Sequence, residues 1–161
     1  MTTRNDDGYL TLFAVGFEKE QWTKIKEVKR HDGWILSLCE ISGKRLVSSL
    51  KEKTLKVWDI NNDILRLINT LQGHNDSVDK IIPLTKDIIA SAGSFDKTIR
   101  VWNVNVFKEI QTLRENFNVY SILKLKIKDE IIAGGFTKSC HFGTQSHLKR
   151  NIQLNVIIVI V

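Results

Sequence analysis

The residues of this chain that could carry out nucleophilic or acid–base chemistry are few. Ser91, His74 and Asp96 lie within one stretch, residues 73–103, and supply the hydroxyl, imidazole and carboxylate of a hydrolase triad. A comparable set begins upstream at His31. A catalytic triad needs one cleft with an activated nucleophile, whereas a set that recurs in every unit of a repeat is structural. We therefore predict no catalytic residue and no enzyme activity.

Other reactive groups give no pattern typical of a cofactor or metal site. Cys140-His141 and His147 could ligate a metal, but the spacing lacks a second pair of ligands. The sequence holds no phosphate-binding loop of the Gly-rich Lys-Ser/Thr kind, and Gly134-Gly135 is predicted to be a strand-end turn rather than a nucleotide loop. We expect neither a cofactor nor a metal.

The histidine-to-tryptophan stretch occurs twice. His31 and His74 are separated by 43 residues, and Trp58 and Trp102 by 44. The two copies end almost alike, in Lys-Thr-Leu-Lys-Val-Trp-Asp and Lys-Thr-Ile-Arg-Val-Trp-Asn. The one-residue difference falls near Gly93, in a predicted turn, where an insertion costs least. A period of about 40–45 residues is the spacing of four-stranded propeller blades.

These motifs resemble the WD-repeat (WD40, Trp-Asp) family of β-propellers. The resemblance implies an all-β fold, an incomplete propeller of about three to four four-stranded blades. We predict a repeat region at 8–143, with full repeats at about 28–70 and 71–113, partial blades at 8–27 and 114–143, and a degenerate tail at 144–161.

Strands are predicted from runs of β-branched and aromatic residues bounded by turn residues. The predicted strands are 9–15, 22–28, 35–41, 45–50, 54–60, 64–71, 78–84, 87–92, 98–104 and 109–113. In the third copy, Asn116 stands at the histidine position, and Cys140-His141-Phe142 takes the strand that should carry tryptophan. Residues 154–161 form a dense apolar β-branched run, which is a further candidate strand, and its last part, 156–161, is expected to be an unprotected β-prone run.

In the family, a His, a Ser or Thr, an Asp and the Trp of one blade form a buried hydrogen-bonded chain. By position, the second repeat offers His74, Asp96 and Trp102, with Ser91 or Ser94 as the hydroxyl. A buried carboxylate must be paired or hydrogen-bonded, and an imidazole beside it satisfies both groups.

The first repeat offers a second version of this chain. Its members are His31, Ser48 and Trp58, with Glu52 where aspartate is expected. Glu52 is one methylene longer than aspartate, so the network is expected to be intact in the second repeat rather than the first.

Recognition residues are expected in the loops at one mouth of the propeller channel, beside the repeated His and Asp. The positions are Trp34, Lys51, Ser77 and Phe95. Trp34 and Phe95 are large apolar side chains at turn-adjacent sites, and the alternative is that they pack between blades.

The composition predicts an ordinary globular protein whose two cysteines are in the reduced thiol form. The net charge is +6, but basic and acidic residues are interspersed, as on a solvated surface, so nucleic acid is not favoured as a partner. Two cysteines make no disulfide framework, and we see neither a signal peptide nor an apolar run long enough to cross a membrane. We expect a cytoplasmic location, with the nucleus as the alternative.

The resemblance implies a non-enzymatic scaffold that binds other proteins or peptides during complex assembly. The alternatives are a substrate-recognition subunit of a ubiquitin ligase and a nucleic-acid-binding module. With incomplete terminal blades, an open ring leaves blade faces and strand edges bare, so we also expect self-association or completion by another chain.

Overall fold

The computed structural model describes residues 9–16, 21–29, 33–61, 64–126, 130–136, 143–149 and 152–160. Every regular element among them is a β-strand, and this part of the chain holds no helix that could span a membrane. The strands of the N-terminal half are β1 Tyr9–Gly16, β2 Gln21–Lys29, β3 Ile35–Ile41, β4 Arg45–Leu50, β5 Thr54–Asn61 and β6 Ile64–Gln72. The others are β7 Val78–Pro83, β8 Ile88–Gly93, β9 Thr98–Asn103, β10 Lys108–Arg114, β11 Asn118–Lys124, β12 Glu130–Phe136, β13 Gly143–Lys149 and β14 Ile152–Ile160.

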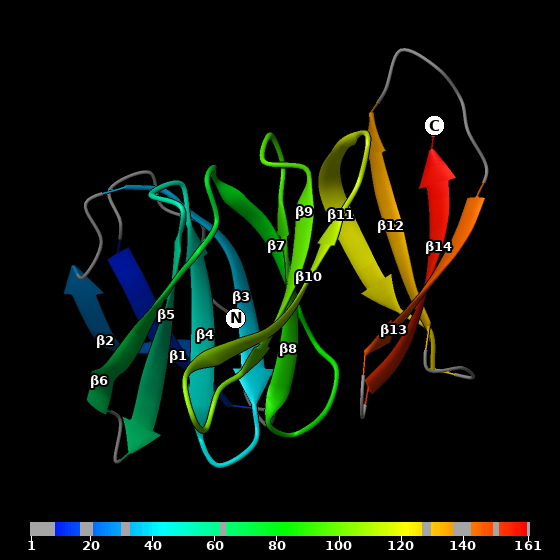
Figure 1. Ribbon diagram of the computed structural model, residues 1–161. Coiled ribbons are helices and arrows are strands. Elements are labelled where there is room, and N and C mark those ends of the chain that lie inside the picture. The colour runs from blue at the N-terminus through cyan, green and yellow to red at the C-terminus, as the bar shows by residue number, and fades with distance from the viewer. Residues whose placement is uncertain are drawn as a thin grey trace.

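The strands form four sheets that stand beside one another in chain order (Figure 1). The first sheet pairs β1 with β2, and the second and third are antiparallel meanders in the orders β3-β4-β5-β6 and β7-β8-β9-β10. The fourth has the order β11-β12-β14-β13. The innermost strands of neighbouring sheets, β3 with β7 and β7 with β11, lie against each other. This arrangement confirms the predicted all-β architecture of propeller blades.

The sequence forms these strands because apolar β-branched side chains alternate with polar ones between turn residues. In β5, Leu55 and Val57 are fully buried, while Lys56 between them is only half-buried. The β3–β4 turn requires a left-handed backbone, which Gly43 supplies at φ 75°. Period-2 alternation directs successive side chains to opposite faces, so Val57 packs toward the third sheet and Trp58 toward the first.

The core lies between the sheets rather than within one of them. Cys39, Val47 and Val57 of the second sheet are buried together with Val78 and Ile89 of the third. A second cluster joins the third and fourth sheets, and a third packs Leu10 of β1 against the second sheet. Each blade is therefore stabilised by burial of apolar surface against its neighbours.

The two full repeats differ in length where the sequence indicated. Ser49 pairs with Leu55 across the turn of the second sheet, and Ala92 pairs with Ile99 across that of the third. The second of these connections is one residue longer. The extra residue therefore lies in the β8–β9 turn that follows Gly93, outside both strands.

The prediction for the end of the chain is wrong about the protection of the tail. The strand beside β12 is β14, in parallel register. The strand predicted around Cys140-His141-Phe142 lies outside the described residues. The β-prone tail is not unprotected, because β14 pairs with β12 on one side and with β13 on the other. The segment that the sequence assigned to a degenerate tail therefore contributes two strands to the fourth sheet.

Candidate functional site

A hydrogen-bonded relay runs through the interior of the third sheet. The indole Nε1–H of Trp102 on β9 donates to Ser91 Oγ on β8 at 2.8 Å. Ser91 Oγ lies 2.7 Å from Nε2 of His74, and Nδ1 of His74 lies 2.7 Å from Oδ2 of Asp96. Since Ser91 Oγ accepts the indole N–H, the consistent chain is one in which its own proton goes to Nε2 and His74 donates Nδ1–H to the carboxylate.

Asp96 is fixed in the β8–β9 turn by its own neighbours. Its Oδ1 accepts from the backbone N–H and the hydroxyl of Thr98 at 2.9 and 2.8 Å, and its Oδ2 also accepts from the N–H of Asn75 at 3.0 Å. Bonding to the backbone two residues ahead is the habit of a short aspartate side chain in a turn. Burial acts to raise the pKa of Asp96, but the hydrogen bonds from His74 and Thr98 outweigh it and lower the pKa to about 2.

The relay has the connectivity of a hydrolase triad but not its accessibility. Ser91 is 0% exposed, and its oxygen already accepts the indole N–H. Gly93 lies so close that a Cβ there would overlap the Asp96 carboxylate and His74 Nδ1. Because no substrate carbonyl can reach the hydroxyl, this set fixes the blade and does not attack a substrate.

The first repeat retains only part of the relay within the described residues. Trp58 Nε1 donates to Ser48 Oγ at 2.8 Å, as the corresponding pair does in the third sheet. Glu52, in the turn that matches the one holding Asp96, is exposed, and His31 lies outside the described residues. Ser94, the other hydroxyl considered for the second repeat, bonds Ser77 Oγ at 3.2 Å instead of joining the relay.

Thr98 is a member of the network that the sequence reasoning missed. It binds both the carboxylate and, at 3.2 Å, His74 Nδ1. The signal was present, because Lys-Thr precedes both tryptophan strands, in Lys53-Thr54 and again in Lys97-Thr98. Lys53 and Lys97 both adopt a left-handed backbone, at φ 68° and 58°, so the turn recurs as well as the residues.

The fourth sheet replaces the polar interior with an apolar one. Asn116, predicted at the histidine position, is exposed, whereas Phe117 is buried. A Cβ on Gly135 would meet the Phe117 ring, just as one on Gly93 would meet His74. Phe117 therefore occupies the place of the imidazole, and Ala133 is buried beside it in the same apolar cluster.

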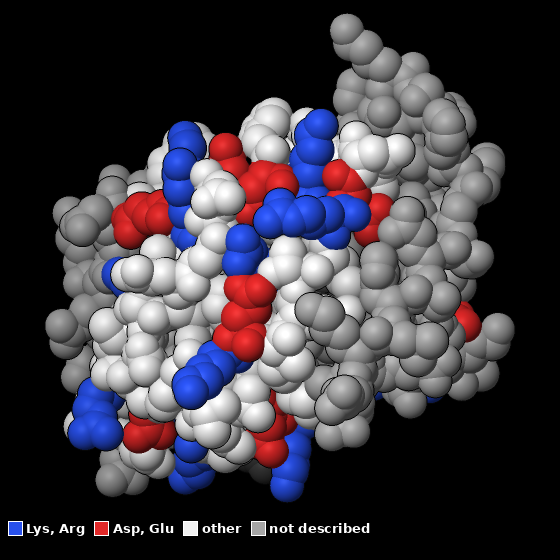
Figure 2. All heavy atoms as spheres, viewed as in Figure 1, with Lys and Arg blue, Asp and Glu red and all other residues white. Residues whose placement is uncertain are grey.

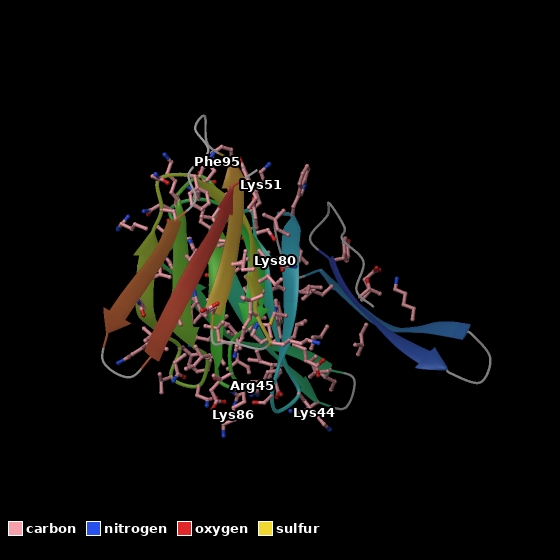
Figure 3. The ribbon with its side chains drawn as sticks, turned by 90° about the vertical axis from the view of Figure 1, so that its right-hand side faces the viewer. Lys44, Arg45, Lys51, Lys80, Lys86 and Phe95 are labelled. Carbon is pink, nitrogen blue, oxygen red and sulfur yellow. The ribbon has the colours of Figure 1, made fainter. Side chains whose placement is uncertain are left out.

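The predicted recognition residues gather at one end of the blades. Lys51 and Phe95 lie at the same end, opposite Lys44, Arg45 and Lys86 (Figure 3). Lys51 Nζ stands 4.6 Å from the centroid of the Trp34 ring, in a cation–π contact. Trp34 is 40% exposed and Phe95 63%, so neither is packed between blades.

One further aromatic residue joins them from the next sheet. Tyr120 is 40% exposed and meets the Phe95 ring edge to face, with the centroids 6.3 Å apart. It occupies the β-bulge of β11 between Val119 and Ser121, and bulges re-aim a side chain out of the alternating pattern. A bulge cannot be read from one sequence, so Tyr120 was not a candidate.

Ser77 lies at the matching position of Trp34 in the next sheet. Its carbonyl accepts from the N–H of Ser94 at 3.2 Å, as the carbonyl of Trp34 accepts from Lys51 at 3.0 Å. We call Trp34, Lys51, Ser77, Phe95 and Tyr120 the aromatic end.

Charge is mixed on the face of the molecule that Figure 2 presents. Lys and Arg side chains lie beside Asp and Glu rather than in one patch. One partly buried pair joins Arg100 on β9 to Glu109 on β10. Over the described surface in this view, there is no continuous basic track of the kind that binds a nucleic-acid backbone.

Metal and thiol chemistry find no support in the described residues. No group of three His, Cys, Asp or Glu side chains there is arranged to hold a metal ion. Cys140 and His141 lie outside these residues, and of His147 only the strand is described. Cys39 is buried, and burial raises the pKa of its thiol to about 11, which suppresses the reactive thiolate.

Comparison with known proteins agrees with this geometry. The family model "WD domain, G-beta repeat" matches residues 22–59 and 65–103. Small ribosomal subunit protein RACK1 of Caenorhabditis elegans is 29% identical over 54% of this chain and 30% of its own length. WD repeat-containing protein 37 of Xenopus laevis is 29% identical over 73% of this chain and 24% of its own, and the human protein of that name is 29% identical over 61% and 20%.

A solved structure gives the same fold. A chain in the crystal structure of a mitotic checkpoint complex superposes with a TM-score of 0.71 at 19% identity, over 84% of this chain and 40% of that one. The matched region spans less than a third of the length of RACK1 and of the two WD repeat-containing proteins 37. With two matched repeats, a buried relay in the second and blades of the same architecture, the chain belongs to the WD-repeat family of β-propellers.

Proposed function

We propose that this chain is a non-enzymatic interaction module that binds a protein or peptide through its aromatic end. The observation that supports the proposal is the exposure of three aromatic rings, Trp34, Phe95 and Tyr120, at one end of three successive sheets. Exposed aromatic side chains are costly in water and are the residues that most often anchor interfaces. WD-repeat proteins generally mediate protein–protein interactions, which agrees with this use of the surface.

The rings are held in place before any partner arrives. Phe95 is braced by Tyr120, and Trp34 by the Lys51 ammonium. Anchors that are already ordered lose little conformational entropy on binding. A scaffold for the assembly of protein complexes is the role that we infer from this surface, with the relay of the third sheet keeping its turn rigid.

The test is site-specific crosslinking. A photoreactive amino acid placed at Phe95 in the full chain should capture a protein from cell extract, and Trp34→Ala or Tyr120→Ala should reduce capture by roughly tenfold. The matched control is the same label at Val106, which is 59% exposed in the β9–β10 turn at the other end of the third sheet. Equal capture from both positions, or capture of nucleic acid, would contradict the proposal.

A further inference from the structure

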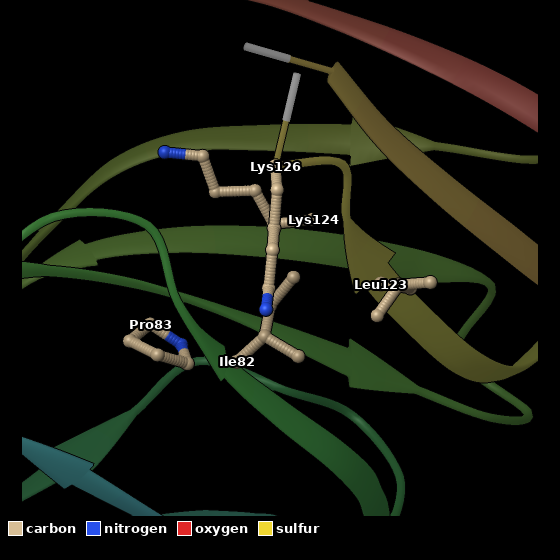
Figure 4. A pocket seen from close by; sticks show the side chains of 5 residues that line it. All are labelled: Ile82, Pro83, Leu123, Lys124 and Lys126. Atoms are coloured by element: carbon tan, nitrogen blue, oxygen red, sulfur yellow. The ribbon is translucent and has the colours of Figure 1, made fainter. Parts of the chain in front are cut away.

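A hollow lies between the third and fourth sheets, where the inner strands β7 and β11 end. Its volume is about 390 Å³, which falls within the usual range for ligand sites. Its lining residues are Ile82, Pro83, Leu123, Lys124 and Lys126 (Figure 4). Both strands begin beside the aromatic end and run away from it, so the hollow lies at the opposite end of the blades.

The hollow arises from the way in which the two sheets are tied. Between the second and third sheets, the short hydroxyl of Ser42 donates to the carbonyl of Lys86 at 2.8 Å, which draws the two turns together. Between the third and fourth sheets, a bond at the same end of the blades runs instead from Lys124 Nζ to the carbonyl of Leu84, also at 2.8 Å. A lysine side chain spans a wider gap than a serine hydroxyl, so space is left beneath it.

The walls combine two kinds of chemistry. Ile82, Pro83 and Leu123 are apolar, and Leu123 is 59% exposed beside the opening. Lys124 and Lys126 bring ammonium groups to the same opening, and none of the five lining residues is acidic. In the neighbouring β7–β8 turn, Lys86 Nζ lies 3.9 Å from the Asp87 carboxylate.

We propose that this hollow binds an acidic peptide segment, with an apolar side chain of the peptide against Ile82, Pro83 and Leu123 and a flanking carboxylate beside Lys126. Charge complementarity selects the carboxylate, and burial of the apolar side chain supplies the larger share of the affinity. A nucleic acid would leave the apolar wall unused, and two lysines neutralise too few phosphates to hold it. The site is separate from the aromatic end.

The probe is a short fluorescent peptide of alternating glutamate and leucine, followed by fluorescence polarisation on the full chain. Lys126→Glu and Leu123→Asp should each weaken binding by roughly tenfold. The first substitution removes the contact with the peptide carboxylate, and the second removes part of the apolar wall. Lys53→Glu, an exposed lysine in the β4–β5 turn, makes the same change of net charge and should leave the affinity unchanged. Phe95→Ala should also leave it unchanged, because Phe95 belongs to the other end.

Two comparison ligands decide between this site and simple charge attraction. A glutamate–serine peptide should bind at least about tenfold more weakly than the glutamate–leucine peptide, because it cannot use the apolar wall. The proposal is overturned if the two peptides bind alike, if Lys53→Glu weakens binding as much as Lys126→Glu does, or if a single-stranded RNA of equal charge competes equally well. Unchanged urea midpoints of the variants show that lost binding is not lost folding.

Discussion

At the scale of single residues, the Asp96 carboxylate holds more of the blade together than any other side chain of the relay. It accepts four hydrogen bonds, from His74, from the Asn75 N–H and from the N–H and hydroxyl of Thr98. Removing an acceptor from buried donors costs their full desolvation, whereas an exposed carboxylate can be removed at little cost.

We expect Asp96→Ala to lower the free energy of unfolding by about 3 kcal/mol, because it leaves buried donors without a partner. Glu52→Ala, at the exposed matching position, should change it by less than about 0.5 kcal/mol. Urea denaturation of both variants measures the difference. Equal losses would show that the first repeat holds a network of its own through Glu52.

The acid response of the protein follows from the same carboxylate. Its pKa is about 2 in the folded chain, against 3.8 for the free side chain. The stability that the Asp96 carboxylate contributes is therefore complete above about pH 4 and is lost as the pH falls toward 2, and it amounts to about 2 kcal/mol.

Glu115 changes the pH dependence of stability in the opposite direction to Asp96. Its burial raises its pKa above 4.5, so the folded protein gains stability from this group as the pH falls toward that value. Comparing the urea midpoint of the native chain with that of Asp96→Asn between pH 5 and pH 2 isolates Asp96, since Glu115 is present in both. The difference should shrink as the pH falls, and a constant difference would contradict the assignment.

At the scale of elements, β14 is the strand on which the fourth sheet depends. It lies between β12 and β13, and within the described residues β13 has no other strand partner. Ile157 pairs with Ile132 on one side and Thr144 on the other, whereas Gln153 pairs with β13 alone.

Ile157→Pro should reduce the hydrogen-exchange protection of β12 and β13 together, because proline has no N–H and is excluded from the middle of a sheet, while the pairing of β12 with β11 remains. Gln153→Pro should reduce protection in β13 and spare β12. Hydrogen exchange resolved by peptide distinguishes the two patterns. Unchanged protection of β12 in Ile157→Pro would mean that β14 is not its neighbour in solution.

The sequence predicts the second and third sheets closely because their repeats carry local signals at every strand and turn. The spans 35–41 and 45–50 match β3 and β4, and the extra residue near Gly93 lies in the predicted turn. The fourth sheet could not be predicted in the same way. Its third strand comes from residues 152–160, and a parallel pairing of distant segments leaves no mark on local periodicity.

The candidate surface shows the same division. Trp34 and Phe95 stand at turn positions that the repeat does not need for its core, so their exposure follows from the pattern. Tyr120 reaches the surface through a bulge, and the bond from Ser94 to Ser77 depends on the distance between two turns. Features of that kind are set by tertiary geometry and by no single stretch of sequence.

At the scale of the whole molecule, the described sheets stand side by side in an open arc rather than a closed ring (Figure 1). The chain aligns with 40% of the length of the propeller chain that it resembles. Blades in such a fold bury their faces against neighbours, so the terminal sheets of an arc keep one face without a neighbouring blade.

We therefore expect the purified chain to associate, either with a second copy or with another chain that completes the ring. Size-exclusion chromatography with light scattering over a range of concentrations measures this directly. A monomer that melts sharply and stays monomeric at high micromolar concentration would contradict the expectation. It would mean that the pairing of β14 with β12 and β13 is enough to protect the end of the arc.

The exchange of His74 for Phe117 between successive blades has a consequence for how the chain can evolve. Around His74, each polar group is the hydrogen-bond partner of the next. A substitution at one position therefore leaves the neighbouring groups without a partner, and only coordinated substitutions keep the network satisfied. Around Phe117 and Ala133, any apolar side chain of similar volume fills the space. The fourth sheet can therefore accumulate neutral substitutions until its sequence no longer resembles the repeat motif. The third sheet must keep the residues of the motif, because its hydrogen bonds depend on them.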